Sequence, residues 1–189
     1  MSIRYHTFIF HIIIILCLPV YSATAFTGAD ENTIKAVLFQ KLARYVEWPQ
    51  ETHINKPEKP FVIGVFGNGP MGELLKRIYE YSGHKINDKA VTIVFFSQPE
   101  QITITDVLFI NKTDEETLEK VLMQLTGKPV LTISDTEGYG EKGVLVNFFV
   151  ENEKVRFEIN LPVFYEHGLS VDFRLRNIAH VIGGENGGR

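Results

Sequence analysis

The sequence contains one glycine pattern that is typical of phosphate-binding loops. Gly67 to Gly72 (GNGPMG) reads G-x-G-x-x-G and directly follows the apolar run Phe61–Phe66. Such a loop binds pyrophosphate because its glycines let the backbone approach and the next helix presents free N–H groups. A dinucleotide site also needs an acid after the second strand, where this chain has Ser97, and Pro70 removes one N–H donor. We interpret the pattern as a tight strand-to-helix turn, and binding of another small anion or ligand stays open.

Polar residues follow three of the expected strands, and the carboxyl ends of parallel strands form the usual ligand crevice of an open sheet. Two of them, Asp135 and Glu137, could act together as a metal-binding or acid/base pair. A solvated glycine-rich loop over residues 134–143 is the simpler interpretation. The candidate ligand crevice comprises Gly67, Asn68, Asn111, Asp135 and Glu137.

A third group of residues could bind a protein partner. Arg44, Glu47 and Trp48 stand at the end of an expected helix, and Arg and Trp are typical interface anchors. Tyr45 belongs to the apolar stripe of that helix, so Arg44 is expected to face outward and to share its face with Glu47. Alternatively, Tyr45 and Trp48 dock the helix on the sheet. Both interpretations hold if one face packs and the other binds.

Other catalytic and metal-binding patterns are absent from the sequence. The four histidines after the leader (His53, His84, His167 and His180) show neither HxH nor HExxH spacing, and no GxSxG is present. The only cysteine, Cys17, lies in the leader. We therefore expect no enzyme, no cofactor and no metal.

The start of the chain indicates export. Arg4 precedes the uncharged run Thr7–Val20, and Ala23-Thr24-Ala25 has the small-x-small pattern of a signal-peptidase site. The run is about 14 residues, short of the roughly 20 that span a bilayer. Residues 1–25 are therefore expected to be a cleaved signal peptide, with no membrane insertion after cleavage. The chain carries 19 basic and 23 acidic residues, so nucleic acid is not an expected partner.

The elements between these sites predict one α/β domain over residues 26–182. Strands are expected over residues 61–66, 91–96, 107–110 and 129–134, and helices over residues 31–47, 70–83 and 114–125. This alternation predicts a mostly parallel open sheet with helices on both faces. The first helix is expected to bury the stripe Ile34, Val37, Leu38, Leu42, Tyr45 and Val46.

The end of the chain has a different pattern. Residues 144–150 and 155–159 predict an antiparallel hairpin, because a short polar link separates two apolar runs. Two short helices are expected over residues 162–166 and 173–182. The glycine-rich tail, residues 183–189, is expected to be disordered.

The segments ARYVEWP (43–49), LTISD (131–135) and RFEINL (156–161) resemble the YfiR/HmsC-like periplasmic proteins. The resemblance covers nearly all of the chain after the leader, in the right order. It implies a non-enzymatic regulator in the periplasm of a Gram-negative bacterium, which represses an inner-membrane diguanylate cyclase by binding its periplasmic sensor domain. Repression would lower cyclic di-GMP and biofilm formation. Unlike cysteine-containing relatives, the exported chain would have no thiol, so disulfide regulation could not operate.

Two other functions stay open at this stage. One is a periplasmic small-ligand-binding domain that uses the candidate crevice. The other is a nucleotide-dependent enzyme, which would need the Gly67 turn to bind phosphate, against the reasons given above. The sequence also leaves a homodimer open.

Overall fold

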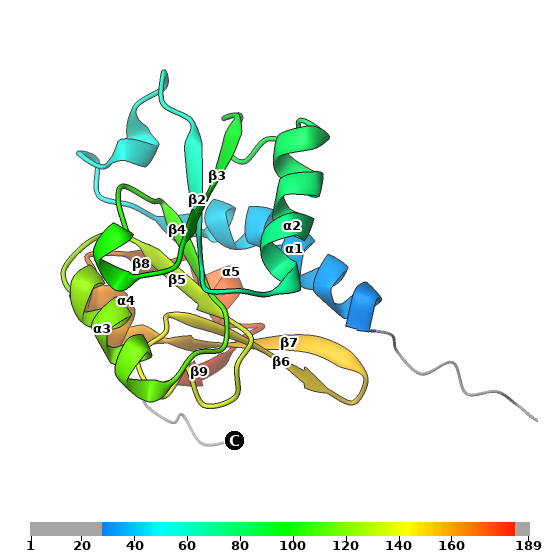
Figure 1. Cartoon of the computed structure of the whole chain (residues 1–189). Coiled ribbons are helices and arrows are strands. Elements are labelled where there is room, and N and C mark those ends of the chain that lie inside the picture. The colour runs from blue at the N-terminus through cyan, green and yellow to red at the C-terminus, as the bar shows by residue number, and fades with distance from the viewer. Residues whose placement is uncertain (1–27, 184–189) are drawn as a thin grey trace, which may run out of the picture.

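The computed structural model describes residues 28–183, which form one seven-stranded mixed sheet covered by helices on both faces (Figure 1). The strand order is β3-β2-β4-β5-β6-β7-β9, and the neighbours from β3 to β6 are parallel. These strands are β2 (Phe61–Phe66), β3 (Val91–Phe96), β4 (Val107–Ile110), β5 (Leu131–Ser134), β6 (Val146–Glu151), β7 (Lys154–Asn160) and β9 (His180–Ile182). The α/β class and the mostly parallel sheet are confirmed. The expected signal peptide and the tail beyond Gly183 lie outside the described residues.

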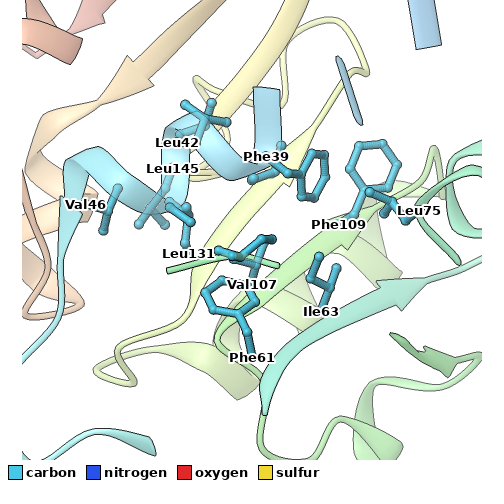
Figure 2. Packing of buried hydrophobic residues seen from close by; sticks show 14 of the residues in the cluster. Phe39, Leu42, Val46, Phe61, Ile63, Leu75, Val107, Phe109, Leu131 and Leu145 are labelled. Carbon is cyan, nitrogen blue, oxygen red and sulfur yellow. The ribbon is translucent and has the colours of Figure 1, made fainter. Parts of the chain in front are cut away.

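Two apolar cores lie on the two faces of the sheet, because alternate side chains of a strand point to opposite sides. On one face pack α1 (Gly28–Tyr45), α2 (Pro70–Leu75), α4 (Leu161–Glu166) and α5 (Phe173–Arg176). On the other face packs α3 (Glu115–Leu125). Figure 2 shows the first core, where Phe39 of α1 lies over Phe109 of β4 with ring centroids 5.9 Å apart.

The first helix differs from its expected form in two ways. It ends at Tyr45, and the next two residues form β1 (Val46–Glu47), which pairs antiparallel with β8 (Ser170–Val171). Pairing with β8 holds the backbone extended here. The buried stripe is also rotated: Ile34 and Val37 are exposed, whereas the fully buried residues are Ala36, Phe39, Leu42 and Ala43. The expected stripe omitted Phe39, which packs on Phe109 of the sheet, and the two alanines beside it.

The expected helix over residues 173–182 is wrong. Only Phe173–Arg176 is helical, and His180–Ile182 forms the edge strand β9, parallel to β7. Backbone pairing with an open sheet edge outweighs local helix propensity in this segment. The hairpin β6–β7 is confirmed and turns at Asn152 and Glu153, both at positive φ, and Figure 1 shows it extending beyond the other strands.

The remaining helical segments are close to expectation. The second helix begins at Pro70 as α2 and continues as a π-helical segment, Lys76–Tyr81, before the expected stop at Gly83. Asp114 caps α3, since its carboxylate accepts a hydrogen bond from the Thr117 N–H at 2.9 Å. Two single 3-10 turns, His53–Asn55 and Pro99–Gln101, lie in the connecting loops.

Candidate functional site

The proposed partner-binding residues do not share one helix face. Arg44 lies exposed on the last turn of α1. Glu47 is exposed on β1, where it alternates with buried Val46, and its carboxylate accepts a hydrogen bond from the Ser170 hydroxyl at 2.9 Å. The expectation that Glu47 lies one helical turn from Arg44 is therefore wrong, because the helix has already ended.

The end of α1 is joined to a distant part of the chain. The Asp172 N–H donates to the Tyr45 carbonyl at 2.9 Å, and the Arg174 guanidinium lies 4.9 Å from the centroid of the Tyr45 ring. Phe173, which lies between Asp172 and Arg174 in the sequence, is 67% exposed. We define the α1–α5 surface as Arg44, Glu47, Phe173 and Arg174. Sequence reasoning missed the last two, because nothing local indicates that residues 172–174 return to α1.

Arg174 is held in place at this surface. Its guanidinium donates to both carboxylate oxygens of Asp172, at 3.0 and 2.7 Å. These hydrogen bonds lower the pKa of Asp172 to about 2. The pair therefore stays charged over the physiological pH range, and the cation is fixed against the Tyr45 ring.

Trp48 belongs to the core of the protein. It is 8% exposed and packs edge-on against Phe61, with ring centroids 6.5 Å apart. Tyr45 is half-buried beneath Arg174. The two aromatic residues thus dock the end of α1, as the alternative interpretation expected, and the outward-facing side chains beside them remain available for binding.

Asn111 fills the turn after β2. Its side-chain amide donates to the carbonyls of Phe66 and Gly67, at 2.9 and 3.3 Å. A Cβ on Gly69 would lie 2.0 Å from Asn111 Oδ1, so a side chain at this position would collide with the amide. Gly67 adopts a φ of +76°, which favours glycine. The G-x-G-x-x-G pattern is thus explained by a tight turn packed on Asn111, with Asn68 exposed at its tip.

Asp135 takes part in a buried ion pair that the sequence did not indicate. Lys35 of α1 is only 4% exposed, and its ammonium lies 2.8 Å from Asp135 and 2.5 Å from Glu31. Burial alone would lower the pKa of Lys35, but the hydrogen bonds and charges of the two carboxylates outweigh it and raise the pKa. Lys35 therefore links α1 to the carboxyl end of β5.

The residues of the candidate crevice lie at two separate sites. Asp135 and Glu137 line an open groove of about 780 Å³ at the carboxyl ends of β5 and β6, together with residues of β7 and β9. Gly67, Asn68 and Asn111 do not line it. The hollow beside Asp135 and Glu137 is therefore separate from the glycine turn, and the binding of a ligand there stays a prediction.

A buried acid lies at the opposite ends of the strands. Asp106 is 3% exposed, and it accepts a hydrogen bond from the Val62 N–H at 2.7 Å. Its other oxygen lies 3.4 Å from His53 Nδ1. Burial raises the pKa of Asp106, although the Val62 hydrogen bond and His53 oppose this shift. The pair borders a hollow of about 740 Å³ whose exposed surface is mainly apolar.

Neither the open groove nor the hollow beside Asp106 contains a metal centre formed by the described residues. Among residues 28–183, no group of three or more His, Cys, Asp or Glu side chains is arranged to hold a metal ion. Within the same range, no helix combines the length and apolar character that a membrane span requires.

The family model described as YfiR/HmsC-like matches residues 32–180. The chain belongs to the YfiR/HmsC-like family. The matched span of this YfiR/HmsC-like chain runs from α1 to the first residue of β9. It therefore includes the α1–α5 surface, the Lys35–Asp135 pair and the open groove.

Proposed function

We propose that this YfiR/HmsC-like protein is an exported, non-enzymatic regulator in the periplasm. It represses an inner-membrane diguanylate cyclase by binding the cyclase's periplasmic sensor domain, and thereby lowers cyclic di-GMP and biofilm formation. The family match over residues 32–180 carries the proposal. The export pattern of residues 1–25 supports it, because an exported regulator can meet the periplasmic part of a membrane enzyme.

The α1–α5 surface is the docking site in this proposal. It combines the exposed Phe173 ring with the cations Arg44 and Arg174, and interface cores are enriched in such side chains. Arg174 is already ordered by Asp172 and Tyr45, so binding costs little further side-chain entropy. The surface fits a partner that presents carboxylates around an apolar patch.

Arg44→Glu tests the docking site. Losing an interfacial charge pair costs about 2 to 5 kcal/mol, so the affinity for the cyclase domain should fall at least about thirtyfold. Stability should change by no more than about 0.5 kcal/mol, because Arg44 is exposed. The affinity is measured by titrating the purified periplasmic domain of each diguanylate cyclase of the host.

Arg77→Glu is the matched control. Arg77 is exposed on the π-helical segment, outside the α1–α5 surface, so this variant should bind like wild type. Equal binding by a normally folded Arg44→Glu protein would place the docking site elsewhere. Failure of the wild-type protein to bind any of the cyclase domains would contradict the proposed function.

A further inference from the structure

The open groove at the carboxyl ends of β5 and β6 is strongly acidic. Among the residues that line it, only His180 can carry a positive charge. The lining includes five carboxylates: Asp135, Glu137, Glu141, Glu151 and Glu158.

Most of this negative charge is not neutralised within the described chain. Lys35 pairs with Asp135, and Arg156 reaches Glu151 only at 4.0 Å. Residues 28–183 provide no ion-pair partner for Glu137 or Glu141. Lys142, the neighbour of Glu141, instead forms an ion pair with Glu115 on α3, with 2.7 Å between its ammonium nitrogen and a carboxylate oxygen. The groove therefore attracts cations.

Asn147 supplies a second, independent indication of a ligand. Its side chain is almost fully buried at the groove, and its amide nitrogen donates to the Thr136 carbonyl and to Glu158, both at 3.0 Å. Because both partners are acceptors, the orientation of the amide is fixed. Its Oδ1 has no hydrogen-bond partner in the described part of the chain. A buried acceptor without a donor is uncommon, and either a water molecule or the N–H of a ligand can supply the missing hydrogen bond.

The rest of the lining is apolar. Phe148, Phe149 and Val150 of β6 border the same groove, and Val150 is 46% exposed. Carboxylates beside apolar side chains suit a cation that is carried on a hydrocarbon stem. A metal ion fits less well, because the described residues offer no cluster of three or more metal-binding side chains.

We propose that this groove binds an organic cation, a guanidinium or primary ammonium group on an apolar stem. Glu137 and Glu158 supply the negative charge, Asn147 Oδ1 accepts an N–H of the cation, and Phe149, on the same face of β6 as Asn147, contacts the stem. The inference goes beyond the regulatory function and does not depend on it.

Calorimetric titration with agmatine, which carries both a guanidinium and an ammonium on an alkyl stem, tests the site. The wild-type protein is expected to bind it in a saturable manner that weakens as salt is added. Glu137→Gln and Glu158→Gln should each weaken binding about ten- to a hundredfold, because each removes a charge-assisted contact. In Glu158→Gln the side-chain oxygen can still accept from Asn147, and melting followed by circular dichroism verifies folding.

Glu58→Gln is the matched control, since Glu58 is an exposed acid before β2 and outside the groove. It should bind agmatine within about twofold of wild type. A capped Gly-Arg-Gly peptide presents the same guanidinium within a chain. Comparing it with agmatine distinguishes a free ligand from the side chain of a protein.

Three results would overturn the inference. The first is the absence of saturable binding of either probe at low salt. The second is equal binding of agmatine by both groove variants and by the control. The third is tighter binding of Ca²⁺ than of agmatine, because the site would then be a metal site.

Discussion

Replacing Lys35 with methionine should lower the free energy of unfolding by about 1 to 3 kcal/mol at pH 7. The ammonium is the counter-ion of both Glu31 and Asp135, and the substitution leaves the two carboxylates without it. Removing one partner of a buried ion pair costs about 3 to 5 kcal/mol. We take a smaller value because the carboxylate side chains keep 25% and 27% of their exposure, and water compensates part of the loss. Methionine retains the apolar stem, so little volume is lost.

Urea denaturation measures this effect conveniently. Trp48 is the only tryptophan and is buried, so its fluorescence reports unfolding of the region beside α1. Lys41→Met is the control, because Lys41 lies exposed on the same helix, and its stability should stay within about 0.5 kcal/mol of wild type.

A double variant provides the sharper test of the ion pair. In Lys35→Met with Asp135→Asn, the carboxylate that has lost its partner is also removed, so part of the stability should return. Wild-type stability of Lys35→Met at pH 7, or simple additivity of the two substitutions, would refute the reasoning.

Two other predictions concern stability. Burial lowers the pKa of His167. Below about pH 6.5 the unfolded chain therefore binds a proton at this residue more readily than the folded chain does. The free energy of unfolding should fall as the pH is lowered below this value, by up to about 1.4 kcal/mol per pH unit. The difference in the free energy of unfolding between wild type and His167→Gln should therefore become smaller as the pH is lowered from 7.5 to 5.5 in urea titrations. A difference that stays constant would contradict this. Gly69→Ala should cost about 1 to 3 kcal/mol, because its Cβ would meet Asn111 Oδ1 at 2.0 Å. In the Asn111→Ala background the same substitution should cost much less, and an unchanged cost in thermal melts would exclude this collision.

The parts of the fold that sequence reasoning predicted well have a local signal. The runs FVIGVF and VLFI are continuous and apolar, as expected for strands buried on both faces, and they became β2 and β4. The polar link of the β6–β7 hairpin is equally local. These elements could therefore be placed within one or two residues.

The errors involve pairing between distant segments. Residues 46–47 and 180–182 become strands only because β8 and β7 offer them backbone partners. Nothing near either segment in the sequence indicates these partners, so the sequence pattern predicts a helix for both segments.

The same limit explains what was missed at the sites. Lys35 is buried because Asp135, 100 residues later, supplies its counter-ion, and Arg174 reaches the end of α1 only through the docking of residues 172–174 on Tyr45. Asp135 and Glu137 were predicted because the carboxyl ends of parallel strands meet at one edge, which topology alone dictates. Asn111 lies apart from that groove because its side chain is hydrogen-bonded to the turn after β2. No local sequence pattern indicates this hydrogen bond.

The most direct test of the central claim is the amount of cyclic di-GMP in cells that lack the gene. The regulatory function predicts that deletion raises cyclic di-GMP and surface attachment. The whole chain should restore the wild-type level, whereas residues 26–189 without the expected signal should not, because they cannot reach the periplasm. Unchanged cyclic di-GMP in the deletion strain, with the protein present in wild-type cells, would contradict the proposed function.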